Sequence, residues 1–209
     1  MKSKPLRSPF ALILLAALAP SLSMAGVVTI EVKTKSGSSA EDTVIILDPL
    51  DTTAAPSHES AIIDQINKRF APRVSVVRTG TSVAFPNSDH IRHQVYSFSD
   101  SKPFTLKLYA GSPKADVVFD KPGLVILGCN IHDTMVAFVG VVDSPYFAKM
   151  PSTGTSILDL PPGRYRVRVW HPSLVAPLPP REITVSAAPA TLPLMVDLDA
   201  SRDVLAPWP

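Results

Sequence analysis

The sequence predicts an all-β protein made of one or two β-sandwiches. Short segments rich in Val, Ile, Thr and Phe recur along the chain, and Gly, Pro, Ser and Asp separate them about every eight to twelve residues. The 22 prolines and the scarcity of segments with a helical apolar repeat argue against a helical protein. One segment, 164–170, also alternates cleanly between apolar and charged side chains.

That alternating segment is the clearest predicted strand. Tyr165, Val167 and Val169 face one way and three arginines face the other, which is the period of a half-buried strand in an antiparallel sheet. We expect the arginine face to be solvated surface. The other predicted strands cover 27–33, 43–47, 73–77, 82–86, 94–97, 104–108, 115–119, 123–127, 137–142, 155–158, 181–185 and 191–198. A short helix is predicted over 60–68, with Ser60 as its N-cap.

The N-terminus has the layout of a secretory signal peptide. Three basic residues precede an apolar run over 10–19, and Ser23 and Ala25 place small residues where a signal peptidase cleaves. The apolar run is too short to span a bilayer, which argues against a retained anchor. We therefore expect residues 1–25 to be removed and the remainder to be periplasmic, without membrane insertion.

Charge gives no reason to propose a nucleic acid or an anionic membrane as partner. The chain has 20 basic and 18 acidic residues, and three of the basic ones lie in the predicted signal peptide. The mature chain is therefore close to neutral. Its single cysteine, Cys129, has no partner for an internal disulfide, so in an oxidising compartment it is either buried in the core or bound to a metal.

The residues that carry chemistry lie in the middle of the chain. Cys129, His132 and Met135 follow one another at intervals of three, and His90 and His93 precede the predicted strand at 94–97. A thiolate, two imidazoles and a weak thioether form a soft, mixed ligand set that selects copper in both oxidation states. Zinc also binds Cys and His, but its structural sites usually take more thiolates.

The spacing predicts that three of these ligands share one short loop. The predicted strand 123–127 leads into Cys129, residues 130–134 form a tight loop, and 136–142 is the returning strand. Cys129 and Met135 could also be ordinary core side chains. His90 is an alternative to His93 as the histidine ligand. His58 and His171 are expected to be structural or exposed.

The surroundings of this motif resemble the cupredoxin family of type 1 copper proteins. The resemblance covers 61–143 and rests on Asp64-Gln-Ile-Asn-Lys-Arg-Phe70-Ala-Pro72, on Val74 to Asn87, on Phe119-Asp-Lys-Pro-Gly123 and on an amicyanin-like short ligand loop; plastocyanins have a longer one. It implies a Greek-key β-sandwich holding one copper through His93, Cys129, His132 and Met135. Similar proteins with a C-terminal extension are labelled methylamine utilisation proteins.

The sequence departs from the family pattern beside the expected ligands. Gln94 follows the first histidine where Asn is frequent, and Asn130 follows the cysteine where Ser or Thr is frequent. The strand before the cysteine also has Leu124, Ile126 and Leu127 where an aromatic residue is frequent. These positions tune the metal, so the departures bear on its reduction potential and its spectral type.

The flanking segments resemble a second small sandwich. Leu160-Pro-Pro-Gly163-Arg-Tyr165 is similar to the strand entry of carboxypeptidase-regulatory-like sandwiches of the Ig or transthyretin type. We expect 27–50 and 146–198 to build this module with the copper domain inserted in it, and 199–209 to be a C-terminal tail. A simple tandem is the alternative.

The expected function is electron transfer without catalysis. The resemblance implies outer-sphere transfer to or from a redox protein such as a c-type cytochrome or a periplasmic dehydrogenase, through an exposed edge of His132 beside Ile131. The first alternative is a periplasmic copper carrier or storage protein. A small copper enzyme, which needs a vacant coordination position, and a metal-free structural protein are the others.

Overall fold

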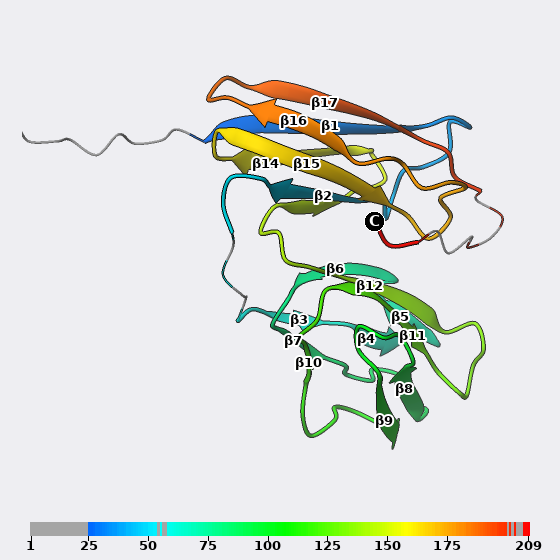
Figure 1. Cartoon of the computed structure of the whole chain (residues 1–209). Coiled ribbons are helices and arrows are strands. Elements are labelled where there is room, and N and C mark those ends of the chain that lie inside the picture. The colour runs from blue at the N-terminus through cyan, green and yellow to red at the C-terminus, as the bar shows by residue number, and fades with distance from the viewer. Residues whose placement is uncertain (1–24, 54, 56–57, 200, 202, 204–206) are drawn as a thin grey trace, which may run out of the picture.

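All regular elements in the described part of the chain are strands (Figure 1). The computed structural model describes residues 25–53, 55, 58–199, 201, 203 and 207–209. The predicted signal peptide thus lies, except for Ala25, outside the described residues. Within them, no helix is long and apolar enough to cross a membrane. The prediction of an all-β chain is confirmed.

Strands from both ends of the chain form the upper sandwich of Figure 1. One sheet has the order β14 (Thr155–Leu160), β1 (Gly26–Thr34), β17 (Ala190–Val196). The facing sheet has the order β13 (Phe147–Lys149), β2 (Val44–Pro49), β15 (Gly163–Trp170), β16 (Arg181–Val185). Apolar side chains from both sheets, among them Ile30, Leu47 and Val167, form one buried cluster.

The middle of the chain forms the lower sandwich. Its larger sheet has the order β6 (Val74–Arg78), β12 (Val136–Val142), β11 (Gly123–Gly128), β8 (His93–Ser97), β9 (Phe104–Tyr109). The smaller sheet is β10 (Val117–Phe119), β7 (Thr81–Ala84), β3 (Ser60–Ile62), and a separate hairpin joins β4 (Asp64–Ile66) to β5 (Arg69–Ala71). The core between the sheets includes Phe85, Phe119, Leu127 and Cys129.

The strand pairing shows how the ends and the middle of the chain are connected. β1 pairs antiparallel with β14 and parallel with β17, and β2 pairs with β13 and β15. The middle segment therefore enters after β2 and leaves before β13 (Figure 1). The division into two domains stays a prediction, because strand pairing alone does not show that each part folds independently.

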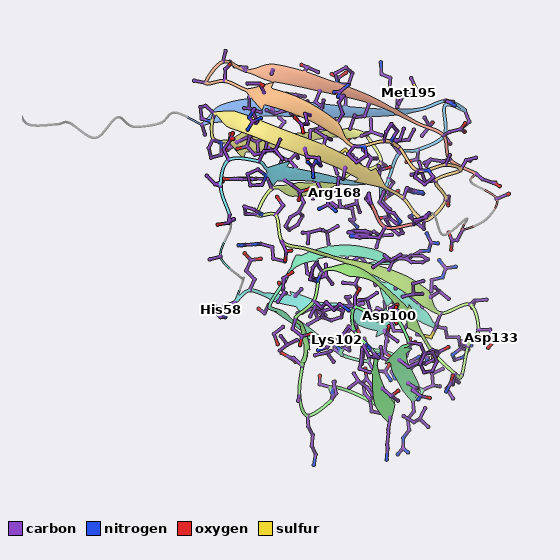
Figure 2. The ribbon with its side chains drawn as sticks, viewed as in Figure 1. His58, Asp100, Lys102, Asp133, Arg168 and Met195 are labelled. Atoms are coloured by element: carbon purple, nitrogen blue, oxygen red, sulfur yellow. The ribbon has the colours of Figure 1, made fainter. Side chains whose placement is uncertain are left out.

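The predicted alternation of 164–170 is confirmed, with one exception on its arginine face. Tyr165, Val167 and Val169 are buried. Arg164 and Arg166 form exposed ion pairs with acidic residues. Arg168, labelled in Figure 2, is mostly covered: its Nε and Nη2 bind the Asp48 carboxylate at 2.5 and 2.8 Å, and Nη1 donates to the Pro209 carbonyl.

The helix predicted over 60–68 is wrong. This segment forms β3 and β4, because alternate residues, Ile63 and Gln65, are buried while Ile62 and Ile66 are exposed. The Gln65 side chain donates to the Pro86 carbonyl at 3.1 Å, a partner that a local pattern does not show. Pairing with a distant segment therefore overrides the helical signal.

A third apolar cluster joins the two sandwiches. Val44, Ile46 and Trp170 from the upper sheet meet Phe138 and other residues of the lower sheet, with the aromatic rings of Phe138 and Trp170 5.7 Å apart. The Trp208 ring lies 5.4 Å from that of Trp170 and covers Gly140, where any Cβ would come within 2.1 Å of it.

Removing the central ring of this cluster tests its contribution to stability. Trp170→Ala should lower the free energy of unfolding by about 3–5 kcal/mol, because it deletes a fully buried indole and leaves a cavity. Denaturant unfolding measures the change. Ile157→Ala is the matched control, since that side chain is 64% exposed, and a loss for Trp170→Ala no larger than the control's would contradict the prediction.

His171 predicts a pH dependence of stability. Burial is the main cause that lowers its pKa below the ordinary 6.5, and Nε2 contacts the Glu41 carbonyl while Nδ1 accepts the Ser173 N–H, an arrangement that needs the neutral ring. The unfolded chain takes up the proton first, so this stabilisation is present above pH 6.5 and is lost as the pH falls toward the folded-state pKa.

The comparison uses His171→Gln. The advantage of the wild type over this variant in the free energy of unfolding should shrink as the pH is lowered from about 7.5 to about 5. Other titrating groups cancel in this difference. Parallel stability curves for the two proteins would show that His171 does not contribute in this way.

Candidate metal centre

Three potential metal ligands converge at one end of the lower sandwich. His93 begins β8, Cys129 directly follows β11, and His132 lies in the loop before β12. One donor atom from each lies within 4.8 Å of the other two. Cys129 Sγ is 3.9 Å from His93 Nδ1, and the centres of the two imidazole rings are 5.2 Å apart.

Strand pairing brings these residues together. β11 and β12 are antiparallel with Gly128 opposite Val136, so the loop between them is closed at its base. Gly128 also pairs with Tyr96 of β8, and a Cβ at this glycine would lie 2.6 Å from the tyrosine ring. A glycine is therefore needed for the strand that carries Cys129 to lie beside the strand that carries His93.

Met135 completes the loop. Its side chain is fully buried in the same core cluster as Cys129. Its backbone N–H donates to the His132 carbonyl at 2.9 Å, which closes a tight turn. The turn fixes the position of His132 relative to Met135 just before β12 begins.

Asp89 holds the His93 ring from behind. Its Oδ2 lies 2.8 Å from His93 Nε2, so Nδ1 is the nitrogen left to face Cys129. The N–H groups of Asn67 and Lys68 donate to the two carboxylate oxygens at 2.7 and 2.9 Å. Both residues have positive φ, of 54° and 58°, in the two-residue turn between β4 and β5.

The charge state of Asp89 suits this role. Its desolvation acts to raise the pKa, but the hydrogen bonds from Lys68, His93 and Asn67 outweigh it, and the pKa of the carboxyl is lowered. An ionised carboxylate behind an imidazole fixes its tautomer and makes it a stronger ligand. Sequence reasoning missed this role, although an acid four residues before a ligand histidine is the signal that shows it.

Two of the residues that the sequence analysis singled out beside the expected ligands bind each other. Asn130 Nδ2 donates to Gln94 Oε1 at 2.9 Å. This bond ties the residue after Cys129 to the residue after His93. It restrains the distance between the two ligand segments without contacting either donor atom.

The described residues fit a metal with a preference for sulfur and nitrogen. His132 Nδ1 is buried and has no hydrogen-bond partner, which is costly unless a ligand occupies it. The donor set of one thiolate and two imidazoles, with a thioether in the same core, has the softness that copper prefers. The sequence contains a single cysteine, whereas structural zinc sites usually use more.

Not all predicted histidines join this group. His90 is exposed and lies outside it, so the structure brings His93 and not its rival to Cys129. His58 is exposed, and His171 is buried in contact with the Glu41 carbonyl. Both therefore have the structural or surface positions that the sequence predicted.

A scan against protein-family models finds no match, and no curated protein matches the chain. Among solved structures, it is similar to a Cu-containing nitrite reductase from Thermus scotoductus SA-01, at 24% identity and a TM-score of 0.38, over 45% of this chain and only 25% of that one. A purple cupredoxin from Nitrosopumilus maritimus has 22% identity and a TM-score of 0.34, over 39% of this chain and 98% of that one.

An amicyanin variant in its Cu(I) form is also similar, at 15% identity and a TM-score of 0.35, over 46% of this chain and 97% of that one. Similarities at this level do not indicate which metal this chain binds. That depends on the donor atoms of its own site. The methylamine utilisation label and the likeness of the flanks to carboxypeptidase-regulatory-like sandwiches stay predictions.

Asp89→Asn tests the carboxylate behind His93. The substitution keeps the size of the side chain but removes its charge, so Cu(II) should bind about 10–100-fold more weakly. Competition with a chelator of known affinity measures the change. Asp133→Asn, at an exposed position of the ligand loop, is the control, and equal affinities for the two variants would show that Asp89 does not support the ligand.

Proposed function

We propose that this chain is an exported electron carrier that holds one copper ion through His93, Cys129, His132 and Met135. The observation that carries the proposal is the convergence of a thiolate and two imidazoles within 4.8 Å at the end of a β-sandwich. Bound copper would supply a one-electron couple between Cu(I) and Cu(II). Redox proteins such as a c-type cytochrome or a periplasmic dehydrogenase are the proposed partners.

The surrounding residues favour electron transfer because they restrain the ligands. Asp89 holds His93, the Asn130–Gln94 bond joins the two ligand segments, and the turn from His132 to Met135 is hydrogen-bonded. A ligand set that is held in place moves little when its metal changes charge. A small rearrangement keeps the barrier to electron transfer low.

Burial indicates where a partner would approach. His93, Cys129 and Met135 are buried, whereas His132 is partly exposed. The neighbouring Ile131 is 50% exposed and offers an apolar contact beside that imidazole. We infer that electrons enter and leave through His132. The buried ligands argue against the ready metal exchange of a copper carrier and against the open coordination position of a copper enzyme.

The proposed location is the periplasm. It rests on the N-terminal signal pattern, with basic residues, an apolar run over 10–19 and small residues at Ser23 and Ala25. The mature chain would then meet its redox partners outside the cytoplasm. An oxidising compartment also suits a cysteine that a metal and the core protect.

Visible absorption and electron paramagnetic resonance of the Cu(II)-loaded mature protein test the proposal. We expect one copper per chain and an intense thiolate-to-copper charge-transfer band, which Cys129→Ser should abolish because it removes the sulfur. His90→Ala should retain the band, since that imidazole lies outside the donor group. A colourless protein that binds only Cu(I) would favour a copper carrier, and no stoichiometric copper in either state would sink the proposal.

A further inference from the structure

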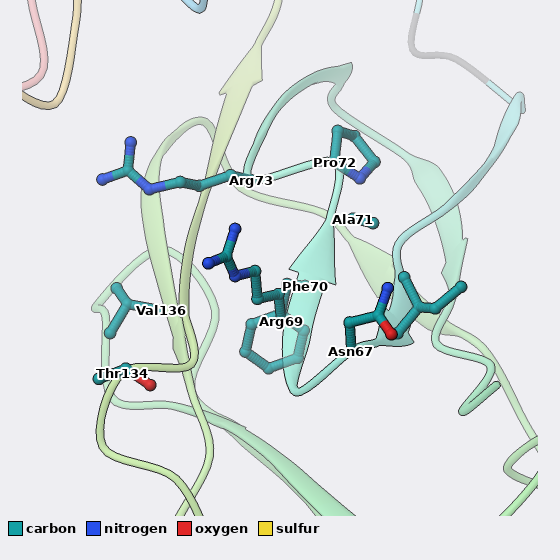
Figure 3. A pocket seen from close by; sticks show the side chains of 9 residues that line it. Asn67, Arg69, Phe70, Ala71, Pro72, Arg73, Thr134 and Val136 are labelled. Atoms are coloured by element: carbon teal, nitrogen blue, oxygen red, sulfur yellow. The ribbon is translucent and has the colours of Figure 1, made fainter. Parts of the chain in front are cut away.

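A cleft of about 820 Å³ opens beside the ligand loop (Figure 3). Its walls come from the β4–β5 hairpin, from Pro72 and Arg73, from Thr134 in the ligand loop and from Val136 at the start of β12. In Figure 3 the guanidinium groups of Arg69 and Arg73 extend toward the side of the hairpin where Thr134 and Val136 lie. The cleft thus borders the proposed metal centre without being part of it.

The side chains that line the cleft are suited to an anion. They include two guanidinium groups, an amide and a hydroxyl, and no carboxylate: Arg69, Arg73, Asn67 and Thr134. Arg73 is already paired, since its Nη2 binds the Asp203 carboxylate at 2.5 Å. Arg69 is exposed and makes no ion pair within the described part of the chain. Its planar donor set is free to bind a carboxylate through two hydrogen bonds.

Neither of the acidic residues near the hairpin forms an ion pair with Arg69. Asp64 accepts a hydrogen bond from Ser88 Oγ at 2.7 Å. Asp89 is occupied by two backbone N–H groups and by His93. Of the two arginines that line the cleft, Arg69 is therefore the one without an ion-pair partner among the described residues.

Two opposite walls of the cleft belong to segments that also form or support the metal centre. Thr134 lies between His132 and Met135 in the ligand loop, so an occupant of the cleft touches that loop. The opposite wall is the hairpin whose turn donates to Asp89, the carboxylate behind His93. A molecule bound here would lie next to the residues through which electrons are proposed to pass.

The shape of the cleft favours a protein side chain over a free anion. Ile66, Phe70, Pro72 and Val136 line it together with the polar groups, so an occupant with an apolar stem and a charged end contacts both. A small inorganic anion would gain only the electrostatic interaction with the guanidinium groups and no apolar contact. Transient redox complexes also depend on complementary charge to orient partners near the redox centre.

We propose that this cleft receives an acidic side chain of the electron-transfer partner, with Arg69 as the anchoring cation. The inference rests on the proposed electron-carrier function. It assigns the partner an acidic surface segment that docks beside the ligand loop, so that its redox centre faces His132.

Nuclear magnetic resonance titration of the mature protein with a blocked tetraglutamate peptide at low salt tests this proposal. Amide shifts should change at 67–71, at Arg73 and at 134–136, and a blocked tetraglutamine peptide should leave them unchanged. Arg69→Gln should weaken binding at least about tenfold, as loss of a charge-assisted hydrogen bond predicts. Arg166→Gln, an exposed arginine of the upper sandwich, is the matched control and should bind as the wild type does.

Several results would overturn the assignment. They are shifts that fall elsewhere, equal binding of the glutamine peptide, an Arg69→Gln variant that binds normally, and inorganic phosphate that binds as tightly as the peptide. The titration is run on metal-free and Cu(I)-loaded protein. Peptide binding by a chain that takes up no copper keeps the acidic docking site and overturns the electron-carrier function, whereas copper uptake without peptide binding does the reverse.

Discussion

The pairing of β11 with β12 is the constraint on which the candidate site depends. These antiparallel strands place Gly128 opposite Val136, and the loop that joins them contains Cys129, His132 and Met135. Because both strands lie inside a five-stranded sheet, the loop ends are held by backbone hydrogen bonds and by the core beneath them. The sandwich therefore supplies the rigidity that a short loop lacks on its own.

A second set of contacts, around His93, comes from outside that pair. Asp89 joins the ligand histidine to the turn of the β4–β5 hairpin, and Gln94 joins the following residue to Asn130. The donor residues are thus restrained by strand pairing in the sheet, by the hairpin through Asp89 and by the bond between Gln94 and Asn130. The same hairpin forms a wall of the cleft with Arg69, so the support of the metal centre and the proposed docking surface are parts of one structure.

The upper sandwich contributes to this arrangement from a distance. Trp170 and Phe138 pack in the cluster that joins the two sandwiches, and Phe138 belongs to β12, the strand that follows the ligand loop. The Arg73 guanidinium also lies 5.2 Å from the centre of the Phe138 ring. Packing between the sandwiches therefore covers one face of the sheet that carries the ligands.

The sequence by itself determined the β class, strands such as 164–170 and the kinds of donor atom at the site, because alternation and side-chain chemistry are local properties. It preferred His93 to His90 only through the family resemblance, and burial beside Cys129 and the contact with Asp89 are what place His93 at the site. It also suggested a helix over 60–68, whereas 60–62 pairs with the distant strand β7 and 64–66 pairs with β5. These outcomes, and the meeting of Arg69 with Thr134 in one cleft, were decided by tertiary structure, since they depend on contacts between segments far apart in the chain.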